Sequence, residues 1–139
     1  MVTVIDAKRH IMGRLSSNVA ERILDGEEIV ILNAEQVVVT GERDVVFAEF
    51  KAKVDRGQIR KGPYYPRRAD LLLKRTIRGM IPWTKTTGRE AYRRIHVFVG
   101  CPEQFNDVEK QTVEDAMRLN TGKYTTLGAV AKFLGSNVR

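Results

Sequence analysis

The sequence lacks the features that several large classes of protein need. Its 139 residues include a single cysteine, Cys101, so no disulfide can form within the chain and a reducing compartment is expected. No apolar run approaches the ~20 residues of a membrane-spanning helix. Residues 1–6 lack the basic and then apolar layout of a secretory signal peptide. We therefore expect a cytoplasmic protein without a membrane-spanning segment.

The sequence also lacks the residue patterns of common catalytic and cofactor sites. The turn after the first predicted strand has one glycine, Gly13, where a dinucleotide-binding fingerprint needs three. His96 and Cys101 are candidates for a zinc site, but a packed cysteine and a surface histidine fit their pattern better. Ser16 and Ser17 fall inside an amphipathic helix rather than on the strand-to-helix elbow of a nucleophile. We predict a non-enzymatic protein with no metal, no cofactor and no small-molecule substrate.

Positive charge is abundant and unevenly distributed. The chain has 24 Lys and Arg against 17 Asp and Glu, a net charge of +7 and a pI near 9.8. Residues 51–94 hold 14 of the basic residues and three of the acidic ones, so the remaining residues are net negative. A concentrated block of like charge repels itself unless an anion binds it. The block is rich in Arg, whose guanidinium matches phosphate, and residues 63–66 (PYYP) interrupt it with aromatic rings. Binding of nucleic acid is the favoured interpretation.

The hydrophobic pattern predicts a single α/β domain over residues 1–139. Short runs rich in β-branched residues predict four strands, at 2–5, 28–32, 37–40 and 95–99. Apolar residues at helical spacing predict six helices, at 12–24, 42–56, 69–80, 87–94, 108–119 and 127–134. Residues 57–68 have no periodicity and several Gly and Pro residues, so they are predicted to form an exposed loop. The alternation of strands and helices indicates a mostly parallel sheet.

Particular side chains follow from these elements. In the 69–80 helix, Ile77 and Met80 are expected in the core, while Lys74, Arg75 and Arg78 share a broad polar face. In the sheet, the buried side chains are expected to be Ile29, Ile31, Val97 and Val99. The last helix is expected to start at an N-cap, Thr125 or Thr126, and to stop at Gly135.

Three blocks at fixed spacing carry a family resemblance. They are residues 74–82 (KRTIRGMIP), Gly88-Arg89 and residues 95–100 (IHVFVG), with five residues in each gap between them. This pattern resembles the signature of the L-thirteen family of large-subunit ribosomal proteins. Shorter blocks along nearly the whole chain agree with it, at 5–7, 12–15, 33–35, 40–41 and 124–127. Residues 62–66 (GPYYP) and 78–82 (RGMIP) are closer to the archaeal and eukaryotic branch than to the bacterial one, and we expect an archaeal member.

The resemblance implies a fold, a function and a set of contacts. The fold is a three-layer α/β/α domain with a short, mostly parallel four-stranded sheet and a basic loop and helix extension, residues 51–94. The function is that of a structural constituent of the large ribosomal subunit, which binds large-subunit rRNA, supports early subunit assembly and touches neighbouring large-subunit ribosomal proteins. The signature positions expected to touch RNA are Lys74, Arg75, Arg78 and Arg89. Charge and exposure alone add Arg67, Arg68, Lys85, Arg93 and Arg94. Gly79 and Gly88 are expected to allow tight backbone geometry.

Some alternatives stay open at this level. A free-standing RNA-binding regulator of translation would have the same charge distribution. A nucleotide-binding enzyme would need the glycines that are missing after the first strand. Tyr64 and Tyr65 either stack on RNA bases or sugars, or pack inside the protein as part of a rigid Pro-bounded loop, and the sequence favours neither.

Overall fold

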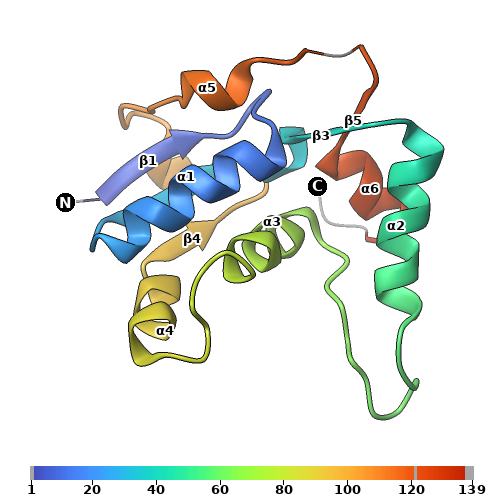
Figure 1. Ribbon diagram of the computed structural model, residues 1–139. Helices are drawn as coiled ribbons and strands as arrows, with labels where there is room; N and C mark the ends of the chain where they lie inside the picture. The colour runs from blue at the N-terminus through green and yellow to red at the C-terminus, as the bar shows by residue number, and fades with distance from the viewer. Residues whose placement is uncertain (1, 121, 137–139) are drawn as a thin grey trace.

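A three-stranded parallel sheet lies at the centre of the computed structural model, which describes residues 2–120 and 122–136. Its strands run in the order β1-β2-β4, with β1 at Val2–Asp6, β2 at Glu28–Leu32 and β4 at Ile95–Val97 (Figure 1). The register aligns Ile5 with Ile31 and Ile31 with Val97. These β-branched side chains line up across the sheet because neighbouring residues of a strand alternate between its faces.

The predicted four-stranded sheet is wrong in one strand. Strand β3 (Val38–Thr40) does not join β1, β2 and β4; it pairs antiparallel with β5 (Tyr124–Thr126) in a separate two-stranded sheet. The β-branched run of β3 was visible in the sequence, but its partner is a three-residue strand in a segment without a strand pattern. The structure is therefore a mixed α/β fold with a parallel and an antiparallel sheet.

Six α-helices and two 3-10 turns complete the described residues. They are α1 (Met12–Leu24), α2 (Arg43–Asp55), α3 (Ala69–Arg78), α4 (Thr86–Arg93), α5 (Glu114–Met117), α6 (Leu127–Phe133), η1 (Ala34–Gln36) and η2 (Glu103–Phe105). Helix α6 starts as predicted, because the Thr126 hydroxyl accepts a hydrogen bond from the Ala129 N–H, and Gly135 follows it with a φ of 99°. Across residues 2–120 and 122–136, none of the helices has both the length and the apolar character needed to cross a bilayer.

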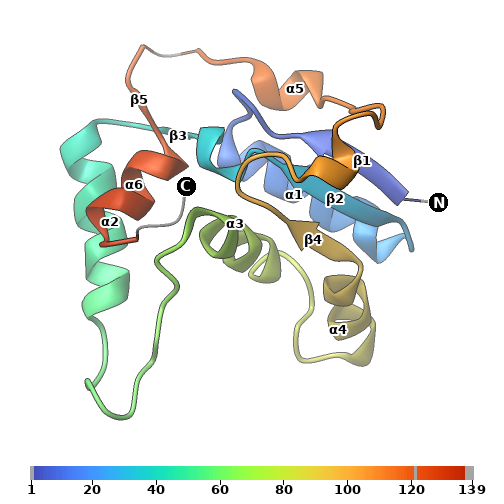
Figure 2. The same ribbon diagram turned by 180° about the vertical axis from the view of Figure 1, so that it is seen from behind.

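The main core lies between the sheet and helices α1 and α3. Ile5, Ile29 and Ile31 point to this side and are fully buried with Leu15 of α1 and Leu72 of α3. Figure 1 shows both helices on the same face of the sheet, and Figure 2 shows the strands from the opposite face. Burying such side chains is the dominant stabilising term of a fold of this size.

The second face of the sheet has a different cover. There, Val4, Val30 and Leu32 pack against Phe98 and Phe105, which belong to the segment that contains η2. The three-layer α/β/α arrangement is thus only partly found: one layer consists of α-helices, while the other comes from a loop and a 3-10 turn. The rings of Phe98 and Phe105 cover the side chains that β1 and β2 present on this face.

The predicted helix over 108–119 is wrong in extent, because α5 spans only Glu114–Met117. In the first half of the predicted range, Gln111 lies beside the edge of β1 and forms an isolated parallel bridge with Ile5. The Gln111 N–H donates to the Val4 carbonyl at 2.8 Å, and the Asp6 N–H donates to the Gln111 carbonyl at 3.1 Å. The free edge of β1 thus satisfies backbone groups that a helix would otherwise have paired internally.

The end of α3 also differs from the prediction. The helix ends at Arg78, so Met80 lies beyond it and is 43% exposed, whereas Ile77 is buried as expected. Val97 and Val99 are only partly buried, while Ile29 and Ile31 are completely buried. Cys101, expected to be packed, is exposed.

Candidate nucleic-acid interface

Helix α3 carries three cations that each lie over an aromatic ring. The distances from the charged group to the ring centroid are 4.9 Å for Lys74 over Tyr92, 5.6 Å for Arg75 over Tyr65 and 4.3 Å for Arg78 over Trp83. We term Lys74, Arg75 and Arg78 the α3 cations. A cation over a ring face is attracted by the ring quadrupole, which holds a long flexible side chain in place. None of the three forms an ion pair with a residue that the structure describes.

The rings below the α3 cations are themselves held firmly. Trp83 and Tyr92 meet edge to face, with 5.0 Å between centroids and 84° between planes. Both rings and Tyr65 pack against the main core. Burial raises the pKa of Tyr92 and of Tyr65. The nearby charges of Arg78 and Arg75 only partly oppose the shift at Tyr92, and that of Arg75 only partly opposes the shift at Tyr65. The phenols are therefore neutral at physiological pH and present uncharged rings to the cations.

Helix α4 carries the next group of basic side chains. Gly88, at its start, lies so close to the Pro82 backbone that a Cβ atom would collide with the Pro82 carbonyl. This tight contact confirms the expectation for Gly88. Gly79 differs, because a Cβ there would meet its neighbours at an ordinary 3.5 Å. The Arg89 Nε donates to the Trp83 carbonyl at 3.1 Å, which connects α4 to the turn that follows α3.

Three of the basic residues predicted to contact RNA are exposed in this region: Lys85, Arg89 and Arg93. Lys85 precedes α4 as its N-cap residue, while Arg89 and Arg93 are one helical turn apart on α4. Contact between α1 and α4 and between α3 and β4 places α4 beside the same end of the core as α3 (Figure 1). Lys74 and Arg78 of α3 thus lie near the basic residues of α4, because Lys74 packs over Tyr92 of α4 and Arg78 packs over Trp83, to whose carbonyl Arg89 donates.

Three other predicted arginines are engaged within the protein. Arg94 donates to the Ile23 carbonyl at 2.8 Å, and Arg67 donates to the Leu134 carbonyl at 3.2 Å. Arg68 forms an ion pair with Asp70 at 3.1 Å. These contacts fasten α4 to the end of α1 and the start of α3 to the end of α6. Each guanidinium thus uses one of its five N–H donors within the protein and is held in place by that contact.

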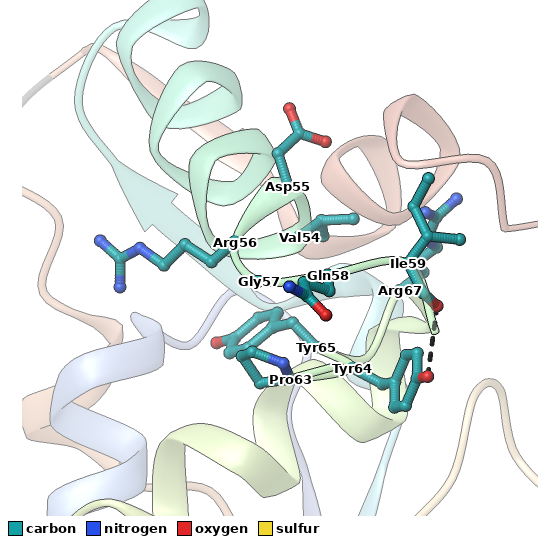
Figure 3. Close-up of a pocket in the computed structure, with 10 residues that line it drawn as sticks. All are labelled: Val54, Asp55, Arg56, Gly57, Gln58, Ile59, Pro63, Tyr64, Tyr65 and Arg67. Atoms are coloured by element: carbon teal, nitrogen blue, oxygen red, sulfur yellow. Dashed lines mark hydrogen bonds between the residues drawn. The ribbon is translucent and has the colours of Figure 1, made fainter. Parts of the chain in front are cut away.

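Tyr64 and Tyr65, for which the sequence left stacking on RNA and internal packing open, lie in different environments. Tyr64 is 69% exposed, and its hydroxyl donates to the Ile59 carbonyl at 3.2 Å (Figure 3). A pair of backbone hydrogen bonds between Gln58 and Gly62, at 3.0 and 2.9 Å, closes the tip of this loop. Tyr65 is half-buried and supports cations with its ring. Tyr64 therefore has an accessible ring, whereas the Tyr65 ring packs inside the protein against the main core.

Several known proteins are similar to this chain in sequence. The family model for "Ribosomal protein L13" matches residues 1–104. A "Large ribosomal subunit protein uL13" from Archaeoglobus fulgidus is 51% identical over 96% of this chain and 87% of its own length. Proteins of the same name from Methanosphaera stadtmanae and Methanocaldococcus jannaschii are each 46% identical, over 98% and 97% of this chain and 99% and 98% of their own lengths.

The chain belongs to the ribosomal protein L13 family. The resemblance stated from the signature blocks is thus confirmed, and the three relatives are archaeal, as expected from residues 62–66 and 78–82. The L13 family is a family of ribosomal proteins and not of enzymes, which confirms the prediction of a non-enzymatic protein. All of the predicted contact residues lie within the matched residues 1–104.

Three residues of this L13 family member were missed in the sequence. Trp83 and Tyr92 support Arg78 and Lys74, and Lys53 of α2 lies 5.8 Å from the Tyr65 ring centroid, on which Arg75 also rests. One signal was available: Trp83 is the only tryptophan of the chain and lies inside the basic block. The position of Lys53 depends on how α2 packs on α6 and α6 on α3, which no local pattern encodes.

Proposed function

We propose that the chain is a structural constituent of the large ribosomal subunit, and that it binds large-subunit rRNA through the α3 cations and the exposed basic residues Lys85, Arg89 and Arg93 at α4. The observation that carries this proposal is the set of three cations over aromatic rings on one helix, without an acidic partner among the described residues. The names of the relatives, which are large-subunit proteins, support the same conclusion.

The chemistry of the surface suits folded RNA. Arg and Lys groups bind phosphate oxygens and release condensed counterions, which supplies affinity without reading sequence. A-form helices hide the base edges of their major groove, so recognition depends on shape, phosphates and 2′-hydroxyls. Cations that are already oriented by rings lose less conformational entropy on binding than free side chains do. Such a surface holds RNA segments in place and thereby supports early subunit assembly, next to neighbouring large-subunit proteins.

Fractionation of ribosomes tests this function. A tagged copy of the chain is expressed in archaeal cells depleted of their own family member, and the lysate is separated on a sucrose gradient. We expect the tagged chain in mature large subunits and in their precursors. Ribonuclease treatment of purified chain bound to large-subunit rRNA then yields the protected fragment.

Two controls make the result decisive. A variant with Lys74→Gln and Arg78→Gln should move towards the top of the gradient while its circular dichroism spectrum stays unchanged. Recovery of the wild-type chain on messenger RNA, away from large subunits, would contradict the proposal and support the free-standing regulator instead.

A further inference from the structure

A cleft of about 450 Å³ lies between the end of α2, the 57–68 loop and α3. Its walls include Lys53 and Arg56 from α2 and its C-cap, Pro63 and Tyr65 from the loop, and Arg75 and Gly79 from α3 and its C-cap. Helix α2 reaches this position because it packs on α6 through stacked Phe47 and Phe133 rings, 4.5 Å apart, and α6 packs on α3. We term this feature the α2–α3 cleft.

The α2–α3 cleft gathers positive charge without compensation. Three of its lining residues, Lys53, Arg56 and Arg75, are cations, and none of the described lining residues is acidic. Lys53 and Arg75 approach the same Tyr65 ring, at 5.8 and 5.6 Å from its centroid, although they come from different helices. None of the three forms an ion pair with a described residue. Like charges that line one cleft repel one another, so a bound anion would lower the electrostatic energy of this arrangement.

The shape of the cleft restricts which anion fits. A volume of about 450 Å³ is that of a small-ligand pocket and suits one nucleotide rather than the outer ridge of a double helix. The guanidinium planes of Arg56 and Arg75 can stack on a base, and the Lys53 ammonium can pair with a phosphate. Gly79 leaves its wall of the cleft open, since it contributes no side chain. In Figure 3, Arg56 points away from the contact between Tyr64 and Ile59 at the loop tip, and Arg56 also lines the α2–α3 cleft.

We propose that the α2–α3 cleft binds one unpaired nucleotide of large-subunit rRNA together with its flanking phosphates. This inference rests on the proposed function and extends it, because Lys53 and Arg56 form a second contact beside the surface made by Lys74, Arg78 and α4. Phosphate oxygens are the chemistry that the cleft recognises, and the polynucleotide backbone is their source. A pocket for an unpaired nucleotide favours RNA that has already folded into a sharp turn over a regular helix.

Two kinds of variant test the cleft. Gly79→Leu fills it without changing charge, and the φ of −68° and the 3.5 Å clearance at Gly79 allow a side chain there. Its matched control is Gly13→Leu on α1, where a Cβ meets nothing within 4 Å. Lys53→Gln with Arg56→Gln removes two charges. Its control is Arg43→Gln with Lys51→Gln, which removes two charges from the same helix but not from the cleft lining.

The probe is the rRNA fragment that the wild-type chain protects from ribonuclease, and binding is measured by filter retention at several salt concentrations. We expect Gly79→Leu to weaken binding by about tenfold, the value of one stacked base. The Lys53→Gln and Arg56→Gln pair should lower the slope of log K against log salt by about 1.4 to 1.8, for two lost phosphate contacts. Both control variants should bind like wild type.

Each other outcome has a distinct meaning. If both cleft variants bind like their controls while Lys74→Gln with Arg78→Gln loses affinity, the cleft is not an RNA site and the proposed function stands. If all variants bind like wild type, the proposed RNA surface itself is wrong. Titration calorimetry with inorganic phosphate and with uridine monophosphate tests whether the cleft binds a free small phosphate instead of RNA. Binding of either one as tightly as the rRNA fragment would overturn the assignment to RNA.

Discussion

The His10 ring accepts a hydrogen bond from the Val113 N–H at 2.9 Å, across 103 positions of sequence. Its other nitrogen, Nδ1, lies 3.0 Å from the Lys8 carbonyl, so Nδ1 carries the proton and Nε2 accepts. His10 is completely buried, and its own backbone carbonyl accepts from the Val38 N–H at 2.8 Å. Through its ring and its backbone carbonyl, His10 therefore connects the β1–α1 turn, β3 and the segment beyond residue 104, where the family match ends.

Replacing His10 with Ala should destabilise the protein by about 1–3 kcal/mol, because the Val113 N–H loses its acceptor in a partly buried place. Urea denaturation followed by circular dichroism measures the change. His96→Ala is the matched control: this histidine is exposed and should change stability by less than about 0.5 kcal/mol. Equal effects of the two substitutions would contradict a structural role for His10.

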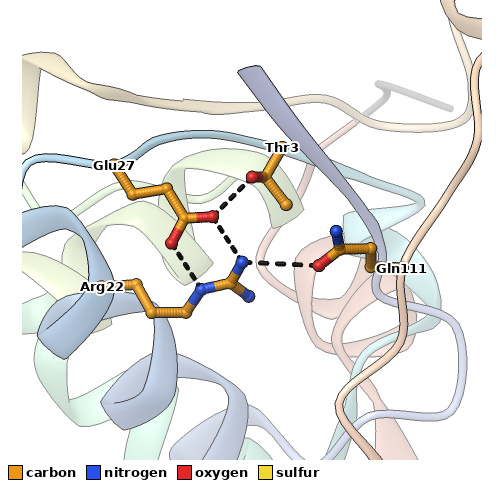
Figure 4. Close-up of polar contacts among 4 residues, drawn as sticks. All are labelled: Thr3, Arg22, Glu27 and Gln111. Atoms are coloured by element: carbon orange, nitrogen blue, oxygen red, sulfur yellow. Dashed lines mark hydrogen bonds and ion pairs between the residues drawn. The ribbon is translucent and has the colours of Figure 1, made fainter. Parts of the chain in front are cut away.

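A polar cluster fastens the same C-terminal segment at another point. Arg22 of α1 donates to both carboxylate oxygens of Glu27, the Thr3 hydroxyl donates to Glu27, and Arg22 also reaches Gln111 at 3.4 Å (Figure 4). The hydrogen bond from Arg22, and next that from Thr3, hold the pKa of the Glu27 carboxyl below its usual range, against a smaller opposing effect of burial. The ionised carboxylate is therefore the form that stabilises the folded chain.

The stability that Glu27 contributes should depend on pH. Because its folded pKa is lowered, the contribution is fully present above the unfolded pKa of about 4.3 and is lost as pH falls through the folded value. We expect Glu27→Gln to be less stable than wild type at pH 7, with a difference that shrinks in acid. Thermal melts between pH 7 and pH 3 measure it. In an Arg22→Gln background the pH-dependent part of the difference should decrease, and an unchanged difference there would assign the effect to another group.

The secondary structure followed from the sequence wherever a long amphipathic stripe met a buried face. The positions of Leu15, Val19 and Ile23 located α1, and those of Leu72, Leu73 and Ile77 located α3. The errors have a common cause. Strand β5 is three residues long, and the 108–113 segment is non-helical and bridges the edge of β1 at Gln111. Such elements depend on their partners, so local pattern does not encode them.

In the candidate site, too, local features could be predicted from the sequence and contacts between distant residues could not. The basic block identified Lys74, Arg75 and Arg78, because charge and helical spacing are local properties. Their support could not be predicted, since Tyr92 and Trp83 meet α3 only after α4 folds back onto it. Arg94 and Arg67 were indistinguishable from free arginines in the sequence, yet each donates to a distant backbone carbonyl. Charge thus predicts where a surface lies, and packing decides which cations are available on it.

The central residue of the sheet gives a direct test of the core. Ile31 is completely buried and lies between Ile5 and Val97 in the register. Ile31→Ala should cost about 2–5 kcal/mol, through lost burial and the cavity that remains. Thermal melts of the purified variant measure it, with Val45→Ala as control, because Val45 is 54% exposed on α2. Equal melting temperatures for the two variants would place Ile31 outside the core.

The α3 cations should act together in RNA binding. Replacing Lys74, Arg75 and Arg78 with Gln should lower the slope of log K against log salt by about two units, at roughly 0.7–0.9 per lost phosphate contact. Gln keeps part of each aliphatic stem over its ring, so the fold should be retained, which circular dichroism checks. Charges that only steer the encounter would change the association rate instead and leave the slope nearly intact. A folded triple variant with the wild-type slope would move the interface to Arg89 and Arg93.

Trp83 should affect RNA binding without contributing charge. Its ring lies 4.3 Å from the Arg78 guanidinium, the shortest such distance on α3. Trp83→Leu removes the ring that orients Arg78, so affinity should fall by about 0.5–2 kcal/mol while the number of phosphate contacts, and hence the salt slope, stays the same. Arg78→Gln should lower both the affinity and the slope, by roughly 0.7–0.9 for the slope. Filter binding of the two variants over the same salt series separates orientation from charge. If Trp83→Leu changed the slope as much as Arg78→Gln does, the ring would hold Arg78 in the bound state rather than only align it. If Trp83→Leu bound like wild type, Arg78 would reach its phosphate unaided.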